Sequence, residues 1–138
     1  MPFLLDTNIL SELRKRHLAN PKLQAWYNTV EDSELFTSVL VIGEIRRGVE
    51  LKRPTNPAFA AKLERWLQWI QQDFQYRILP VTQEIAEVWG TLSPTRPLAE
   101  PDGLIAATAM HHNLILVTRN VRDVHRSGVT ILRTPDLR

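Results

Sequence analysis

The sequence predicts an α/β protein, a three-layer α/β/α sandwich built on a four- to five-stranded, mostly parallel sheet. Short apolar runs alternate along the chain with segments in which apolar residues recur at helical spacing. This alternation is typical of parallel strands whose two faces are covered by helices. The 138 residues suffice for a sizeable core, and we expect one domain spanning residues 1–138.

Each expected strand is short, and the segments between strands have the apolar spacing and the capping residues of helices. Strands are expected at residues 3–5, 35–37, 77–79, 114–118 and 129–132. Helices are expected at residues 7–16, 21–30, 39–51, 57–74, 83–92 and 102–112, with Ser38 and Thr82 as caps and loops at 53–57 and 93–101. The helix at 102–112 is apolar on nearly every side, which predicts a central position.

The composition excludes several classes of protein and site. The 43% hydrophobic and 23% charged residues exclude a disordered chain, and the absence of Cys excludes disulfides, thiolate zinc sites and Cys nucleophiles. No apolar run is long enough to span a membrane and no signal peptide is recognisable, so we expect a cytoplasmic protein. The net charge of +2 comes mainly from Arg, which suits phosphate contacts, although a salt-bridged surface explains it equally well.

Four acidic residues stand where a parallel sheet would gather them. Asp6 follows the first strand, Asp102 opens the apolar helix, Glu44 borders an apolar helical stripe and Asp123 follows the fourth strand. Ligands of such sheets bind outside the carboxyl ends of the strands. Like charges at close range need a cation, and oxygen ligands suit Mg²⁺ or Mn²⁺. Taken singly, the acids have simpler explanations: helix caps for Asp6 and Asp102, a surface acid for Glu44 and a turn residue for Asp123.

Three segments carry a resemblance to a known family. They read FLLDTNILSEL (3–13), SVLVIGEIRRGV (38–49) and EPDGLIAATAMHHNLILVTRNVRDV (100–124). In order and spacing they resemble the PIN-domain family, in particular the VapC-type ribonuclease toxins of bacterial toxin–antitoxin pairs. The resemblance covers essentially the whole chain and implies the PIN-like α/β/α fold.

The resemblance also implies the roles of individual residues. The metal-holding and catalytic acids fall on Asp6, Glu44, Asp102 and Asp123. Asn120 stands where many relatives carry an acid. The polar residues expected around the acids, or in contact with nucleic acid, are Thr7, Asn8, Thr118 and Asn120. The cations proposed for RNA phosphates are Arg46, Arg119 and Arg122, because they are close in sequence to the proposed ligands.

The activity implied by the resemblance is Mg²⁺-dependent hydrolysis of RNA, with Mn²⁺ as a possible substitute. Water would attack the phosphorus in line and leave a 3′-hydroxyl and a 5′-phosphate. The family further implies a toxin of a type II toxin–antitoxin pair, a homodimer and a small antitoxin that blocks the site.

Two other functions remain open at this point. A catalytically inactive PIN fold that serves only as a binding module would explain Asn120 in place of an acid. A phospho-receiver domain also carries acids at the carboxyl edge of a small parallel sheet. A receiver needs a Lys after a late strand, however, and no Lys follows Lys62.

Overall fold

A computed structural model describes residues 2–92, 98 and 100–132 of the chain. Within these ranges four strands form one parallel sheet in the order β3-β2-β1-β4. The strands are β1 (Phe3–Leu5), β2 (Leu35–Ser38), β3 (Ile78–Leu79) and β4 (Ile115–Val117). In the central strand, Leu4 pairs with Phe36 on one side and with Leu116 on the other. The parallel sheet predicted from the sequence is confirmed.

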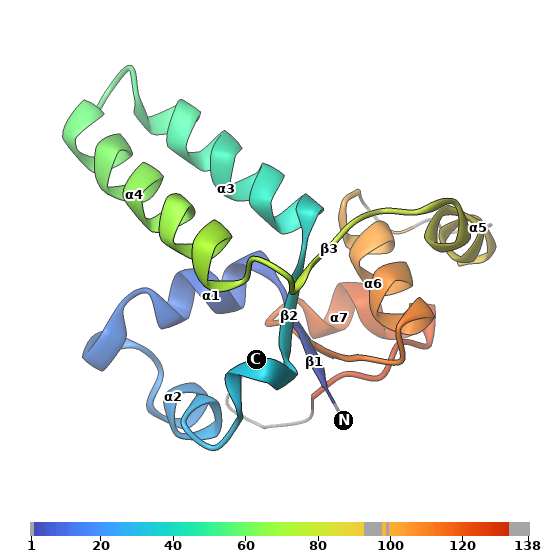
Figure 1. The fold of residues 1–138 in the computed structure, drawn as a ribbon. Helices are drawn as coiled ribbons and strands as arrows, with labels where there is room; N and C mark the ends of the chain where they lie inside the picture. The colour runs from blue at the N-terminus through green and yellow to red at the C-terminus, as the bar shows by residue number, and fades with distance from the viewer. Residues whose placement is uncertain (1, 93–97, 99, 133–138) are drawn as a thin grey trace.

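Helices cover both sides of this sheet, which gives the predicted three layers (Figure 1). One side carries α1 (Thr7–Leu13), α2 (Pro21–Tyr27), α3 (Val39–Lys52) and α4 (Pro57–Asp73). The other carries α5 (Gln83–Thr91), α6 (Asp102–His111) and α7 (Val121–Val124). Three 3-10 turns connect them: η1 (Arg16–Leu18), η2 (Asp32–Glu34) and η3 (His125–Ser127). Helices α3 and α4 lie side by side as a hairpin that projects away from the sheet (Figure 1).

Local sequence signals explain where the helices begin. The side chain of Ser38 accepts a hydrogen bond from the Leu40 N–H at the start of α3, and Thr82 accepts one from the Ile85 N–H at the start of α5. Such caps satisfy backbone N–H groups that have no partner inside the helix. Both predicted caps are therefore confirmed.

Several predicted boundaries are wrong. Helix α1 ends at Leu13 rather than at residue 16, because Arg16 adopts a left-handed φ of 57°. Helix α2 ends at Tyr27 rather than at residue 30. Residues 129–132 form an isolated bridge between Leu116 and Ile131 instead of a fifth strand, and the unexpected helix α7 precedes them. Most of the loop expected at 93–101 lies outside the described residues.

The core lies around β1, β4 and α6. Leu4, Leu5, Leu116 and Val117 are completely buried, and so is most of α6, as its all-round apolar sequence predicts. Complete burial of one such side chain contributes about 1.5–3 kcal/mol. These strands therefore form a rigid base for the residues at their carboxyl ends. No helix in the described part of the chain is long and apolar enough to cross a membrane.

Candidate metal and catalytic site

The site lies where the order of the strands reverses. The chain moves from β1 outward to β2 and β3, and then returns to place β4 on the other side of β1. A crevice is expected at the carboxyl ends of strands on either side of such a reversal. Asp6 directly follows β1 and Thr118 directly follows β4, and the Thr118 hydroxyl donates to Asp6 Oδ2 at 2.8 Å. The first predicted acid therefore stands in the predicted crevice.

Thr7 joins Asp6 to Glu44. Its backbone N–H donates to Asp6 Oδ1 at 2.8 Å, and its hydroxyl donates to Glu44 Oε1 at 2.6 Å. Asp6 is thus the N-cap of α1, as its simpler explanation requires, and is at the same time connected to the acid on α3. The buried carboxylate of Asp6 is surrounded by neutral donors.

Asn120 connects Asp102 to the same network. Its side-chain amide donates to Asp102 Oδ2 at 3.0 Å, and its backbone N–H donates to the Thr118 hydroxyl at 3.0 Å. Asn8 donates to Asp6 Oδ2 at 3.4 Å and to Thr118 Oγ1 at 3.3 Å. Hydrogen bonds therefore run continuously from the acid on α3 to the acid on α6. Asp102 is the first residue of its helix, and Pro101, not Asp102, occupies the cap position.

The acids are close enough to affect one another's ionisation. Burial raises the pKa of Glu44 above its usual value, and the charge of Asp6 raises it further, against the hydrogen bond from Thr7. Burial also raises the pKa of Asp102, followed by the charges of Asp6, Glu44 and Asp123, against the hydrogen bond from Asn120. All four predicted acids therefore contribute to one negative field, although Asp123 itself is exposed on α7.

The chemistry of these residues fits a hard divalent cation. The donors are all oxygens, and hydrogen bonds from the described residues leave Glu44 Oε2 and Asp102 Oδ1 available. Across residues 2–92, 98 and 100–132, no three Asp, Glu or His side chains are already arranged as a finished set of metal ligands. The carboxylates must therefore turn toward one another to share an ion. Mutual repulsion without a cation favours the separated arrangement.

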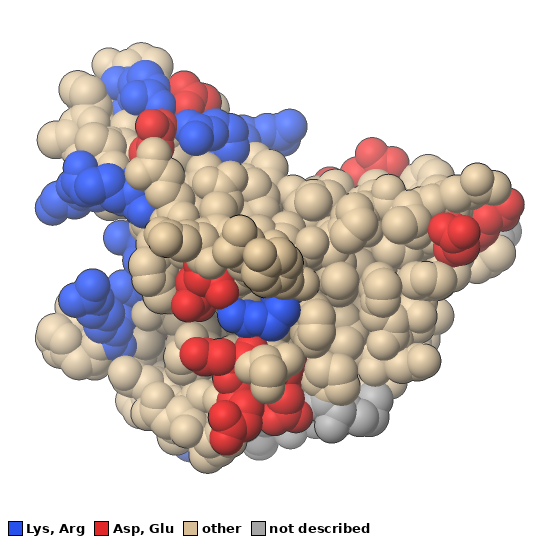
Figure 2. Space-filling model, viewed as in Figure 1, with Lys and Arg blue, Asp and Glu red and all other residues tan. Residues whose placement is uncertain are grey.

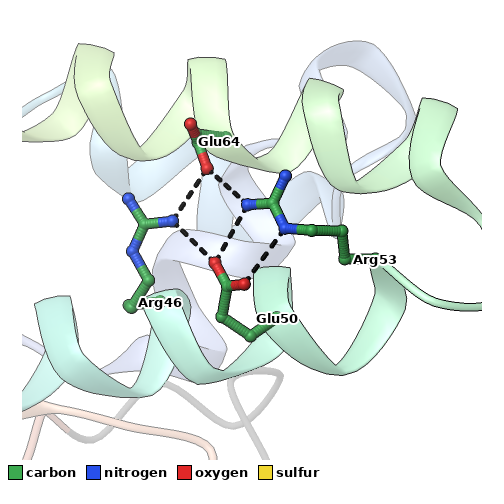
Figure 3. A network of polar contacts seen from close by, with 4 residues as sticks. All are labelled: Arg46, Glu50, Arg53 and Glu64. Atoms are coloured by element: carbon green, nitrogen blue, oxygen red, sulfur yellow. Dashed lines mark hydrogen bonds and ion pairs between the residues drawn. The ribbon is translucent and has the colours of Figure 1, made fainter.

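The three Arg residues predicted to contact phosphate lie in different surroundings. Arg46 is paired with Glu50 and Glu64 on the α3–α4 hairpin (Figure 3). Arg119 is paired with Glu12 at 3.0 Å, and its backbone N–H donates to Asn8 Oδ1, so it does lie beside the site. Arg122 is exposed on α7.

Two residues near the site, Arg47 and Glu12, are not among the site residues selected from the sequence. The charge of Arg47, not that of Arg46, lowers the pKa of Glu44. A signal for this was present, because residues three apart on a helix share a face whereas residues two apart do not. Glu12 is a buried acid that binds Lys15 and Arg119 and accepts the Asn20 N–H. Nothing local in the sequence indicates its pairing across 107 residues.

A groove lies between α1, α2 and α4. Its volume is about 930 Å³ and it is open to solvent. Its cationic lining is Arg14, Arg16, Lys62 and Arg65, and its aromatic lining is Tyr27, Trp66, Trp69 and Phe74. Lys and Arg side chains flank a hollow on this side of the molecule (Figure 2). None of the described lining residues is acidic.

The chain belongs to the PIN domain family, whose model matches residues 3–126. It is 30% identical over 133 residues to Toxin FitB of Neisseria gonorrhoeae, covering 93% of this chain and 94% of that protein. It is 28% identical over 138 residues to the VapC ribonuclease Y4jK of Sinorhizobium fredii, covering 94% of each. The crystal structure of FitAcB from Neisseria gonorrhoeae matches with a TM-score of 0.83 and 31% identity, over 95% of this chain and 96% of that one.

These comparisons confirm the resemblance drawn from the three sequence segments. The relatives are named as a toxin and as VapC ribonucleases, which is the branch of the family that the sequence predicted. Because the chain belongs to the PIN domain family, the hypothesis of a phospho-receiver domain is dropped.

Proposed function

We propose that the chain is a Mg²⁺-dependent endoribonuclease and the toxin of a type II toxin–antitoxin pair, carried by one PIN domain spanning residues 1–138. The observation that carries the proposal is the convergence of carboxylates from three distant segments, Asp6, Glu44 and Asp102, joined through neutral hydrogen-bond donors. The names of the relatives support a ribonuclease and a toxin. An RNA substrate would place its action in the cytoplasm.

The residues that would hold the cation are Asp6, Glu44 and Asp102, with Asp123 as a fourth carboxylate. When bound, Mg²⁺ or Mn²⁺ would supply charge neutralisation and polarisation of the phosphodiester. The hydroxyl of Thr7 orients Glu44 by holding Oε1, which would leave Oε2 for the cation. Because its pKa is raised, Glu44 would also be a better acceptor for a proton from the attacking water than an ordinary carboxylate.

The polar neighbours position these carboxylates rather than react. Thr118 and Asn8 both donate to Asp6 Oδ2, and Asn120 donates to Asp102 Oδ2. Neighbours that orient ligands typically change metal affinity or activity about 10–100-fold when they are removed. We therefore assign Asn120 a positioning role in place of the acid found in many relatives.

Cations around the crevice would bind the phosphates of RNA. We propose Arg122 and Arg119 for this role, the first because it is exposed and the second because Glu12 fixes it beside the site. We propose Arg47 for the same role, because its charge lowers the pKa of Glu44. Arg46 would have to leave its ion pairs with Glu50 and Glu64 to contribute, so we rank it last.

The groove between α1, α2 and α4 suits an antitoxin. Its aromatic and apolar side chains would bury the apolar face of a peptide helix, and its four cations would pair with acidic side chains of that helix. One similar structure is titled as a toxin–antitoxin complex from Klebsiella pneumoniae, and another is titled as FitAB bound to a DNA fragment. We propose a cognate acidic antitoxin as the partner, and a homodimer as the state of the toxin.

The test is cleavage of structured RNA by the purified protein with Mg²⁺, compared with Asp6→Asn and Asp102→Asn. We expect cleavage by the wild type, with 5′-phosphate products, and none by either variant. Wild-type protein that binds RNA or an antitoxin but cuts no RNA with Mg²⁺ or Mn²⁺ would instead establish the inactive binding module.

A further inference from the structure

The first turn of α6 carries Asp102 and follows a proline. Pro101 occupies the cap position, and its side chain makes no capping hydrogen bond. Helix α1, by contrast, is capped by the side chain of Asp6. Packing around the first turn of α6 therefore matters for where this helix begins, and with it for the place of the Asp102 carboxylate.

Gly103, directly after Asp102, lies against an aromatic ring. Helix α5 packs along α6 (Figure 1), and the indole of Trp89 on α5 faces this glycine. A Cβ at residue 103 would lie 3.1 Å from both Cδ1 and Nε1 of Trp89, and 3.5 Å from Leu98 Cβ. Contacts of 3.1 Å are shorter than ordinary van der Waals separations between such atoms. The backbone of α6 approaches the indole this closely because residue 103 has no side chain.

We propose that Trp89 is a positioning residue whose indole, seated against Gly103, holds the first turn of α6 and thereby places the Asp102 carboxylate at the site. The inference rests on the proposed function in taking Asp102 as a working site residue. In this proposal Trp89 acts on the carboxylate indirectly. It acts through the backbone, one residue away from the group that it positions.

The displacement that a side chain at residue 103 would cause is comparable to the positional tolerance of a metal site. A methyl group at residue 103 would require the ring or the helix to move by a few tenths of an ångström. Metal-ligand distances tolerate only about 0.2 Å, and functional side chains must be held within about 0.5 Å. A displacement of α6 would also change the hydrogen bond from Asn120 to Asp102 Oδ2, now 3.0 Å long.

Gly103→Ala tests this contact, and Gly90→Ala is its matched control. Gly90 lies on α5 next to Trp89, and a Cβ there would meet nothing within 4 Å. We expect Gly103→Ala to shift the ¹⁵N resonance of the Asn120 side-chain amide in metal-free protein, and to raise the Mn²⁺ midpoint in a thermal-shift titration about tenfold. Gly90→Ala should change neither quantity.

A double variant shows whether the effect of Gly103→Ala depends on Trp89 or comes from a general loss of stability. In a Trp89→Leu background the obstacle to the new methyl group is gone, so Gly103→Ala should raise the Mn²⁺ midpoint less than twofold further. An equal, additive loss in both backgrounds would overturn the proposal. So would a Gly103→Ala protein in which the indole N–H resonance of Trp89 shifts while the Asn120 resonance and the midpoint do not, because the ring would then have moved instead of the helix.

The readouts also distinguish failure of this inference from failure of the proposed function. The Asn120 resonance reports on Asp102 without metal or RNA, so it tests the positioning role even in a protein that cuts no RNA. If Gly103→Ala does not fold, Trp89→Leu alone is the second variant. It should shift the same resonance, and an unchanged resonance would overturn the proposal.

Discussion

Two groups of charged residues on this molecule use the same side chains in opposite ways. On the α3–α4 hairpin, Arg46 and Arg53 each bind both Glu50 and Glu64 at 2.8–3.0 Å (Figure 3). Hydrogen bonds from Arg53 and Arg46 lower the pKa of Glu50 to about 2. In the crevice, burial and neighbouring acids raise the pKa of Glu44, six residues earlier on the same helix.

The difference separates a structural role from a functional one. A carboxylate that is matched by cations of the chain has no need of another partner. The crevice carboxylates are held by neutral Thr and Asn donors and repel one another, so a cation from outside would relieve the repulsion. The raised pKa values of Glu44 and Asp102, caused by burial and by neighbouring acids, therefore support the proposal of a site that binds a cation.

The largest expected effect comes from neutralising one crevice acid. Asp102→Asn should lower the rate of RNA cleavage more than about a hundredfold. The variant loses a proposed metal ligand, and losing a residue that only orients such a ligand already lowers metal affinity or activity about 10–100-fold. Its metal-free Tm should equal or exceed that of the wild type, since one repelling charge is removed. Cleavage assays and calorimetry on the same preparations measure both. A normal rate would remove Asp102 from the site.

Added cation should stabilise the crevice and leave the hairpin unaffected. At a Mg²⁺ or Mn²⁺ concentration a hundred times the dissociation constant, binding to the folded state adds about 2.7 kcal/mol of stability. For a chain of this length that is roughly a 10 °C rise in Tm. The rise should disappear in Asp102→Asn and should not be reproduced by KCl at equal ionic strength. An equal rise in the variant would place the cation elsewhere.

The raised pKa values of Glu44 and Asp102 should make their contribution to the free energy of unfolding decrease as the pH rises. Glu44 and Asp102 keep their protons to higher pH in the folded chain than their usual pKa values of 4.5 and 3.8 allow. Their contribution is therefore present at low pH and is lost as the pH rises from those values through the folded-state pKa values. Denaturant titrations of metal-free wild type and Asp102→Asn give a difference that isolates this contribution.

That difference, wild type minus variant, should fall as the pH rises across the window. Subtraction removes the opposite contribution of Glu50 and Glu64, whose pKa values are lowered and whose stabilisation is lost as the pH falls. A difference that is flat or that increases with pH would contradict the raised pKa of Asp102.

The smallest effect is expected on the hairpin. Arg53→Gln removes one of two cations from a fully exposed network, and exposed ion pairs contribute little to stability. The Tm should fall slightly at low salt, and the loss should shrink in 1 M NaCl, where screening acts over about 3 Å. Cleavage should be unchanged. A large loss of activity would mean that the hairpin charges belong to the RNA-binding surface after all.

The sequence was sufficient to predict the sheet and most of the helices, while the metal site formed by the acids stays a prediction. Asp6 and Asp102 could be placed because residues that follow buried strands, or open helices beside them, share one edge of a parallel sheet. The short helix α7 escaped prediction because four residues make barely one turn and show no periodicity. The apolar run at 129–132 reads as a strand, yet it pairs with β4 at a single bridge.

Side-chain partners across long separations were beyond sequence reasoning. The pairing of Glu12 with Arg119 and the approach of Trp89 to Gly103 depend on how the elements pack. Sequence reasoning could have selected Arg47 instead of Arg46. Arg47 follows Glu44 by three residues on the same helix, so the two side chains share a face.

The most direct test of the cation site is anomalous diffraction from crystals of the protein soaked in Mn²⁺. The account predicts one or two Mn²⁺ peaks between the carboxylates of Asp6, Glu44 and Asp102, and none at Glu50 or Glu64. Peaks confined to the surface, with the three crevice carboxylates bound only to Thr7, Thr118 and Asn120 at saturating Mn²⁺, would contradict it.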